Sequence, residues 1–270
     1  MRKVGDSRYF EMLLAHNPRS PSITLCRIPE LELLSALELP EPVLDHCCGD
    51  GFIAETAFGG KKVAAGVDID RSRLAAARKR GCHEVVEWGD ASARLPFGDD
   101  AFASVINNSG IEHIAELDGA LREISRVLRT GGLLVMNVLN DRYFENWPGS
   151  DNDARRYRDW QPFHHALSAE EWTERLAGHG FSDVRFVDYF DSEVSRVLAD
   201  LDFRYSGFFL RKRFSLRTLY ELLWPVSAQR ERWRKAFRDL SWDAEPGHGC
   251  GFQIIAVKDG PAPGAARSGS

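Results

Sequence analysis

A glycine-rich loop with the residue types that hold a nucleotide follows the first predicted strand. A β-rich run at 42–47 leads into the sequence Asp45-His46-Cys47-Cys48-Gly49-Asp50-Gly51. Glycine at positions 49 and 51 permits backbone conformations and a close ligand approach that a side chain would block. With Ala54 the glycines form Gly-x-Gly-x-x-Ala, a loose match to the dinucleotide fingerprint. We therefore expect a nucleotide-containing ligand at this loop.

The charge of the loop helps to choose between candidate ligands. A pyrophosphate held by the turn would lie near the carboxylate of Asp50, with Asp45 just behind it, and like charges at that range repel. S-adenosylmethionine has no phosphate and carries a positive sulfonium, so an acidic loop suits it. A nicotinamide cofactor, and with it an oxidoreductase, remains an alternative that rests on the loose fingerprint alone.

The end of the second predicted strand offers a carboxylate and an apolar neighbour. Asp68 follows Gly66-Val67 and can accept hydrogen bonds from both hydroxyls of a ribose, while Ile69 can lie against an adenine. Such charge-assisted hydrogen bonds contribute roughly 1.5–3 kcal/mol each. Asp68 can also cap the following helix, but Asp70 is better placed for that role.

Three histidines are candidates for a general base or for positioning an acceptor. An oxygen, nitrogen or acidic carbon that receives a group must lose its proton to a base within hydrogen-bond reach, and histidine suits this task near neutral pH. His113 follows the fourth predicted strand, and His164 and His165 lie in an aromatic stretch before a capped helix. For each of the three, a structural hydrogen bond or a packing role is the alternative.

The elements that position these residues alternate between β-rich and helical patterns, as in strand-helix-strand units on a parallel sheet. Strands are predicted at 42–47, 62–68, 83–88, 101–107, 133–139, 184–189 and 252–257. Helices are predicted at 71–80, ended by Gly81, over Leu117 to Leu128, closed by Gly131 and Gly132, and from Ser168 to about Gly180. The expected fold is a doubly wound α/β sandwich.

The composition is that of an ordinary soluble chain in which no metal site is expected. Its 270 residues are 43% hydrophobic and 28% charged, with a net charge of −5. No apolar run approaches the roughly 18–20 residues of a membrane span, so we expect a cytoplasmic protein. The five cysteines are odd in number and form no Cys-x-x-Cys pair, which indicates reduced thiols rather than zinc ligands.

Three regions lie outside the alternation. Residues 1–40 are expected to form a helical arm or lid before the main domain at 41–258, and residues 259–270 a disordered tail after it. A helical cap is predicted at about 191–248, between the last two strands. Within it, residues 204–238 hold ten Lys and Arg against two Glu, interleaved with aromatic residues. We favour a packed cap; an anionic or lipid-like acceptor or a peripheral membrane contact is the next alternative, and nucleic acid comes last.

Five motifs in order resemble a known family. VLDHCCGDG resembles the first motif of class I S-adenosylmethionine-dependent methyltransferases, usually VLDLGCGTG, and GVDID resembles the second. GDASARLPFGDDAF, VINNSGIEHI and LREISRVLRTGGLLVM are similar to the motifs that follow. The resemblance covers about residues 42–140 and points to the small-molecule branch with a methyltransferase type 11-like domain. It implies a Rossmann-like seven-stranded sheet whose last strand is antiparallel.

The resemblance also implies roles for individual residues. Asp45, Gly49 and Gly51 would hold the methionine end of the cofactor and Asp68 its ribose; Asp90 would take the adenine amino group with Ala91 beside it, and Asn107 would border the methyl group. Two positions depart from the family pattern. Cys47 stands where the first motif has glycine, and Ala103 replaces the aspartate of the common FDVV run.

These observations together predict an enzyme that transfers a methyl group from S-adenosylmethionine to an oxygen, or else a nitrogen, of a small molecule. Cys47 leaves open a protein of the same fold that binds the cofactor and transfers nothing, because its side chain occupies a place where backbone usually approaches the ligand.

Overall fold

A seven-stranded sheet with the order β3-β2-β1-β4-β5-β7-β6 forms the centre of the fold. The computed structural model describes residues 1–211 and 223–259. The strands are β1 Val43–His46, β2 Val63–Asp68, β3 His83–Trp88, β4 Phe102–Asn108, β5 Leu128–Leu139, β6 Phe181–Tyr189 and β7 Gly251–Lys258. The order, with β7 antiparallel, confirms the predicted doubly wound, Rossmann-like sheet.

The register of the central strands brings the candidate site residues to one edge. β1 pairs in parallel with β2 and with β4, and Asp45 lies opposite both Gly66 and Ile106. Asp68 lies at the carboxyl end of β2 and Asn107 near that of β4, the two strands on either side of β1. Ligands of open parallel sheets bind beyond this edge, so the register positions the predicted residues together.

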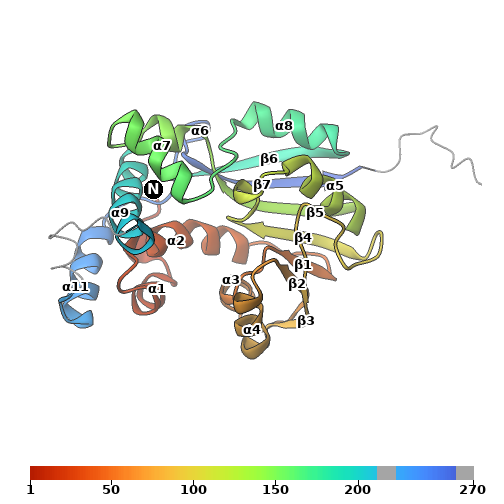
Figure 1. Ribbon diagram of the computed structural model, residues 1–270, viewed down its shortest axis with the longest axis horizontal. Coiled ribbons are helices and arrows are strands. Elements are labelled where there is room, and N and C mark those ends of the chain that lie inside the picture. Colours follow the sequence, from red (N-terminus) through yellow and green to blue (C-terminus); the bar gives the residue numbers. More distant parts are fainter. Residues whose placement is uncertain (212–222, 260–270) are drawn as a thin grey trace, which may run out of the picture. The chain divides into compact units, whose positions relative to one another are not determined.

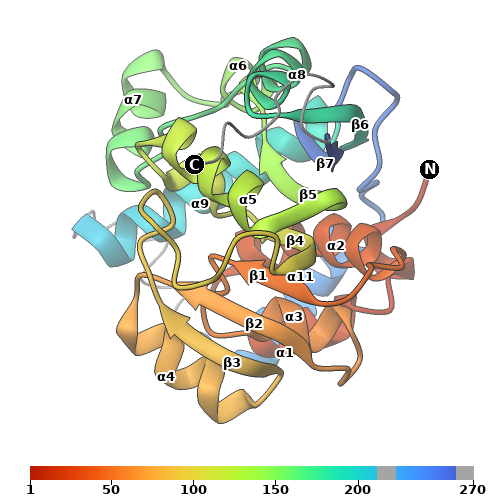
Figure 2. The same cartoon turned by 90° about the vertical axis from the view of Figure 1, so that its right-hand side faces the viewer.

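Four helices accompany these strands: α3 Phe52–Ala57, α4 Arg71–Arg80, α5 Leu117–Val127 and α8 Ala169–Gly178. Figures 1 and 2 both show α4 beside β2 and β3, against which it packs. The prediction of a helix at 71–80 is confirmed. Asp70 caps it by accepting hydrogen bonds from the backbone N–H groups of Ser72 and Arg73, and Gly81 ends it at φ 71°.

One predicted helix is too long. Leu128 was assigned to the helical face that begins at Leu117, but the helix α5 ends at Val127 and Leu128 is the first residue of β5. Leu128 adopts an extended backbone at ψ 138° and is fully buried all the same. Leu128 matches the helical spacing of buried residues because it is itself buried, although it belongs to a strand.

The chain divides into two compact units. One comprises Glu38–Met136, Ala169–Phe186 and the residues from Ile254 onward, and it holds the glycine loop and strands β1 to β4. The other comprises Met1–Leu37, Asn137–Ser168 and Val187–Gln253. It therefore combines most of the predicted arm at 1–40 with the whole of the predicted insertion at about 191–248. The predicted disordered tail lies outside the described residues, apart from Asp259.

The second of these units is mainly helical. It contains α1 Phe10–His16, α2 Pro21–Ser35, α6 Asp141–Glu145, α7 Asp151–Trp160, α9 Ser192–Arg211 and α11 Val226–Phe237, after a short 3-10 turn η1 at Val4–Asp6. Helix α9 packs against α2, α6 and α7, and α1 packs against α11 (Figure 1). The segment between β6 and β7 thus holds the helices α9 and α11, while residues 238–250 form turns and isolated bridges. The side chains of 204–222, half of the basic segment, lie outside the description.

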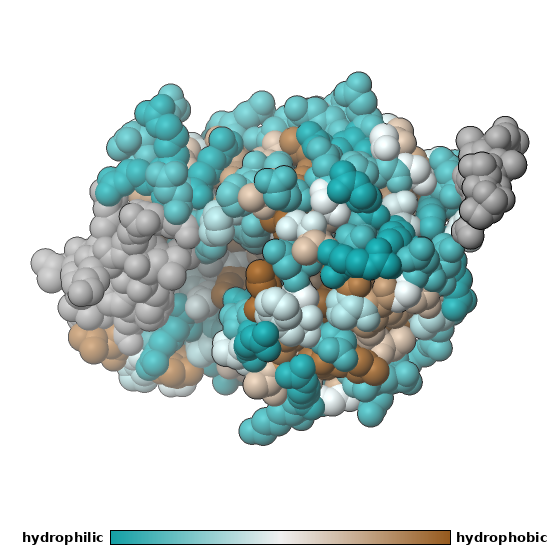
Figure 3. All heavy atoms as spheres, turned by 45° about the vertical axis from the view of Figure 1, so that its right-hand side comes forward, coloured by the Kyte–Doolittle hydropathy of each residue, from teal (hydrophilic) through white to brown (hydrophobic). Residues whose placement is uncertain are grey.

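The surface is mainly hydrophilic on the face shown in Figure 3, with smaller hydrophobic areas between. Within residues 1–211 and 223–259, no helix is both long enough and apolar enough to cross a membrane. The same residues contain no group of three or more His, Cys, Asp and Glu side chains suited to a metal ion.

Gly66 in β2 has no room for a side chain, which gives a test of the packing behind the loop. A Cβ at this position would lie 2.9 Å from His83 Cδ2 and 3.0 Å from Cys48 Sγ. Gly66→Ala should lower the free energy of unfolding by about 1–3 kcal/mol, because packed interiors resist an added methyl group. Gly98→Ala is the matched control, since a Cβ at Gly98 meets nothing within 4 Å. Urea unfolding measures both; two equally stable variants would contradict the packing.

Candidate functional site

The glycine loop after β1 has the backbone that its sequence predicts. Gly49 and Gly51 adopt positive φ angles of 55° and 79°. A Cβ at Gly51 would lie 2.8 Å from Cys82 Sγ, so glycine is required there by packing as well as by conformation. Cys47 also has a positive φ, 62°, at the position where the resemblance expects glycine.

Two amide groups of the loop are already used within the protein. Gly49 N–H donates to Asp68 Oδ2 at 2.8 Å, and Gly51 N–H donates to the carbonyl of Cys48 at 3.0 Å. A loop that cradles a pyrophosphate must offer its N–H groups to the ligand. This geometry therefore does not support the nicotinamide dinucleotide alternative.

The negative charge of Asp50 is offset, which corrects part of the argument from sequence. Arg80 Nη2 lies 3.1 Å from Asp50 Oδ2, and Arg80 Nε donates to the Asp50 carbonyl at 3.0 Å. The same guanidinium also pairs with Glu55. Repulsion by Asp50 thus explains less of the loop's ligand preference than its charge alone suggested, and the use of the loop amides explains more.

Asp68 connects the ends of two strands and still has capacity to bind a ligand. Its Oδ2 accepts from Gly49 N–H and its Oδ1 from Asp70 N–H, both at 2.8 Å. Asp68 is half-buried, so a ligand can reach its side chain. An ionised carboxylate offers about four lone-pair positions, so it can still accept hydrogen bonds from ribose hydroxyls. Ile69 beside it is 60% exposed, an apolar surface that suits a base. These features fit a nucleoside.

The predicted adenine residues lie close to Asp68 in the fold. Gly89 N–H donates to the carbonyl of Asp68 at 3.2 Å, which joins the loop after β3 to the end of β2. Asp90 Oδ1 accepts from Ser92 N–H at 2.9 Å and from Ser92 Oγ at 2.8 Å, and this turn orients its carboxylate. Ala91 is half-buried between them.

Asp45 is buried and bonded to a histidine that the sequence analysis did not single out. Asp45 is 3% exposed, and its Oδ2 lies 2.9 Å from His83 Nε2. The other ring nitrogen of His83 lies 3.4 Å from Cys82 Sγ. Burial raises the pKa of Asp45, although the hydrogen bond from His83 opposes the shift. Asp45 thus stands behind the loop, and its contact with the methionine end stays a prediction.

Both polar atoms of the Asn107 side chain form hydrogen bonds within the protein. Its Nδ2 donates to His46 Nδ1 at 2.7 Å and to the His46 carbonyl at 3.2 Å, while its Oδ1 accepts from Gly110 N–H and Ile111 N–H at 3.2 and 2.9 Å. Asn107 is 1% exposed. The side chain thus holds the loop after β4, and its proximity to a methyl group stays a prediction.

His46 is a second residue that sequence reasoning missed. It is fully buried, and burial lowers its pKa to about 4. The neutral ring accepts the amide of Asn107 at Nδ1, which assigns the proton to Nε2. A polar residue inside an otherwise buried strand was the available signal, but its partner lies 61 positions away in the chain.

Cys47 packs against the loop after β4. A Cβ at Gly110 would lie only 2.7 Å from Cys47 Cβ, so glycine at 110 makes room for the cysteine. Burial raises the pKa of the Cys47 thiol well above its usual range. The thiol is therefore protonated near neutral pH, and this favours an unreactive packing residue.

The three candidate histidines fall in different units. His113 ends the 3-10 turn η2, Ile111–His113, in the unit that holds the glycine loop, and it is half-buried. His164 and His165 lie between α7 and α8 in the other unit, with ring centroids 6.2 Å apart. Which of them acts on an acceptor stays a prediction.

Comparison with known proteins identifies relatives of the chain. Residues 44–136 match the family described as methyltransferase domain. A probable S-adenosylmethionine-dependent methyltransferase of Mycobacterium tuberculosis is 32% identical over 185 residues, which are 68% of this chain and 62% of that relative. A demethylmenaquinone methyltransferase of Mycobacterium bovis is 40% identical over 98 residues, covering 36% of this chain and 40% of the relative.

Solved structures share the fold. A methyltransferase of Thermotoga maritima, described as a possible histamine N-methyltransferase, aligns with a TM-score of 0.58 at 18% identity and covers 93% of this chain and 98% of its own. Phosphoethanolamine N-methyltransferase 2 of Haemonchus contortus, solved with S-adenosyl-L-methionine, aligns at 0.54 and 21%, covering 83% and 50%. The chain spans about 62% of the length of the mycobacterial relative.

The buried His46 predicts a pH dependence of stability. In the unfolded chain, His46 takes up a proton below its ordinary pKa of 6.5. In the folded protein it does so only near pH 4. Its contribution is therefore complete above pH 6.5 and falls as the pH drops toward 4, by at most about 3 kcal/mol. His46→Gln should flatten this part of the profile.

Urea unfolding near pH 7 and near pH 5 measures the effect. His164→Gln, a change at an exposed histidine, is the control and should keep the wild-type slope. A His46→Gln profile parallel to that of the wild type would show that the ring is not held neutral.

Proposed function

Because the chain belongs to the class I S-adenosylmethionine-dependent methyltransferases, we propose that it transfers a methyl group from that cofactor to a small-molecule acceptor, at oxygen first and nitrogen second. The observation that carries the proposal is the Asp68 carboxylate. It accepts a hydrogen bond from the Gly49 amide that a phosphate would need, and it keeps lone pairs for ribose hydroxyls.

The cofactor would be held by one edge of the sheet. Asp68 accepts the ribose hydroxyls and Ile69 gives the base an apolar surface; Asp90, with Ala91, receives the adenine amino group. Asp90 Oδ1 already accepts from Ser92, and Oδ2 accepts no hydrogen bond from any described residue, which leaves it for this amino group. Gly49 and Gly51 give the methionine end close access to backbone, with Asp45 behind them.

The bound cofactor supplies a methyl carbon on a sulfonium sulfur whose departure leaves a neutral thioether. The chain's own task is then to align the acceptor atom with that carbon, because alignment alone can supply about 7–11 kcal/mol of the barrier reduction. A second task is to remove the acceptor's proton. His113, His164 and His165 are the candidates for this base, as histidine transfers protons readily near neutral pH.

The acceptor itself is proposed only as a class. Relatives named as 2-phytyl-1,4-naphthoquinone methyltransferases and as a demethylmenaquinone methyltransferase match 33–36% of this chain. That share is comparable in size to the methyltransferase-domain match at 44–136, so it supports the cofactor chemistry more than any acceptor. A small molecule remains the class that these relatives support.

Asp68→Ala should weaken binding of S-adenosylhomocysteine at least about tenfold, because it removes a charge-assisted acceptor for the ribose. Isothermal titration calorimetry measures the affinity. Glu84→Ala removes an exposed carboxylate from β3 and serves as the charge-matched control that should bind as the wild type does.

Two results would contradict the cofactor assignment. One is an Asp68→Ala protein that folds and binds S-adenosylhomocysteine with unchanged affinity. The other is saturable binding of NAD, titrated in parallel, where S-adenosylhomocysteine does not bind at all.

Replacing each candidate histidine by alanine tests the proton-transfer step. If one of His113, His164 and His165 is the base, its loss should lower turnover at saturating cofactor by about 10²–10⁴-fold. The measurement is transfer of a radiolabelled methyl group to the acceptor fraction of a cell extract. Three variants that all keep the full rate would rule out a histidine base among them.

A further inference from the structure

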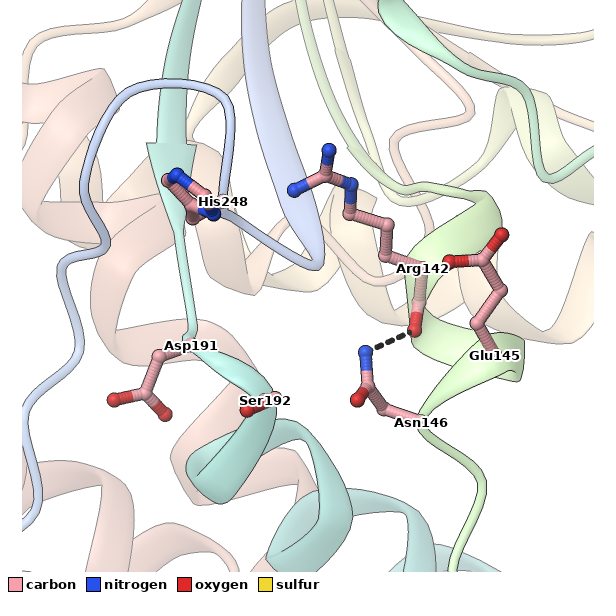
Figure 4. A pocket seen from close by; sticks show the side chains of 6 residues that line it. All are labelled: Arg142, Glu145, Asn146, Asp191, Ser192 and His248. Atoms are coloured by element: carbon pink, nitrogen blue, oxygen red, sulfur yellow. Dashed lines mark hydrogen bonds between the residues drawn. The ribbon is translucent and has the colours of Figure 1, made fainter.

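A pocket of about 340 Å³ lies in the helical unit, among residues that the cofactor site does not use. Its lining comes from α6, from the start of α9 and from the segment before β7 (Figure 4). The lining residues are Arg142, Glu145, Asn146, Asp191, Ser192 and His248. The pocket is large enough for a small polar ligand.

Arg142 is the dominant charge that faces the opening. Figure 4 shows its guanidinium directed toward the side of the pocket that carries His248. Among the described residues, the Arg142 guanidinium forms no ion pair and no hydrogen bond, although the residue is half-buried. A guanidinium is a planar donor set that matches the geometry of carboxylate and phosphate oxygens.

The two carboxylates of the lining do not compensate this charge. Asp191 Oδ1 accepts from Glu193 N–H and Val194 N–H, each at 2.9 Å, and so caps helix α9. In Figure 4 its carboxylate turns away from the opening, as does that of the exposed Glu145. The opening therefore presents the Arg142 cation and the Ser192 hydroxyl, beside a helix start whose amides Asp191 already accepts.

The polar side chains of Asn140 and Asp188 hold both walls of the pocket in place. Asn140 is fully buried; its Oδ1 accepts from Arg142 N–H at 3.1 Å and its Nδ2 donates to the Gly249 carbonyl at 2.9 Å. Asp188 accepts from Gly247 N–H at 3.2 Å and from Gly249 N–H at 2.9 Å, which fixes the turn that carries His248 between them. The backbone that carries Arg142 and His248 is thus fixed, which lowers part of the entropic cost of binding.

We propose that this pocket binds an oxyanion, a carboxylate or a phosphate group, through the guanidinium of Arg142. His248 and Ser192 complete the donor set from the facing walls. The anion is either a free ion or the charged group of a small organic molecule, and both sources share the chemistry that Arg142 recognises.

Calorimetric titration of the full chain with inorganic phosphate, acetate and phenyl phosphate tests the proposal. The wild type should bind phosphate or acetate saturably, and Arg142→Gln should weaken that binding at least about tenfold, because it removes the charge from the hydrogen bonds. Arg142→Lys, which keeps the charge but loses the planar fork, should fall between them. Arg196→Gln, at an exposed position of α9, is the matched control and should bind as the wild type does.

The two sources of the anion are separated by the phenyl ester. Binding of phenyl phosphate that is tighter than that of inorganic phosphate, and equally dependent on Arg142, indicates the charged group of an organic molecule; equal affinities indicate a free ion. Absence of saturable binding for all three probes, or binding that Arg142→Gln leaves unchanged in a folded protein, overturns the proposal. Because S-adenosylhomocysteine binding is measured separately, either failure leaves the methyltransferase proposal standing.

Discussion

The carboxylate of Asp68 holds together the sheet edge at which we propose the cofactor binds. It accepts the amide of Gly49 from the loop after β1 and the amide of Asp70 at the start of the next helix, each at 2.8 Å. One side chain thereby links the ends of two adjacent strands. A loop whose amide is bonded to a carboxylate presents that carboxylate, not a bare N–H, to the ligand, and this distinguishes a nucleoside site from a phosphate site.

Buried polar pairs support this edge from both faces of the sheet. Asp45 bonds to His83, and His46, the next residue along β1, bonds to Asn107. Successive side chains of a strand point to opposite faces, so the two pairs stiffen β1 from either side. Because an unsatisfied buried polar group costs about 1–3 kcal/mol, each pair specifies one arrangement of its loop rather than merely filling space.

The sequence predicts local features well and distant partners poorly. The helix from Arg71 to Arg80, with Asp70 as its cap, follows from signals within a few residues. The hydrogen-bond partners of Asp45 and His46 lie 38 and 61 positions away in the chain, and no local sequence pattern predicts them. The charge of Asp50 was visible in the sequence, but its neutralisation by Arg80 depends on how the helix after β2 packs. Local rules therefore place the candidate residues at the sheet edge, while their charges and hydrogen bonds depend on the tertiary fold.

Cys47 shows how the fold accommodates a departure from the family pattern. A non-glycine residue at φ 62° costs about 1–2 kcal/mol relative to ordinary backbone, and the cysteine keeps this conformation nonetheless. The neighbouring loop leaves room, because Gly110 has no Cβ to meet the one at Cys47. Asn107 and Asp68 bond the segments on either side, so the hydrogen bonds that define the site also hold the strained residue. The glycine of the family motif is thus replaced, while Gly49 and Gly51, two and four residues further on, keep their positive φ angles and their amide hydrogen bonds.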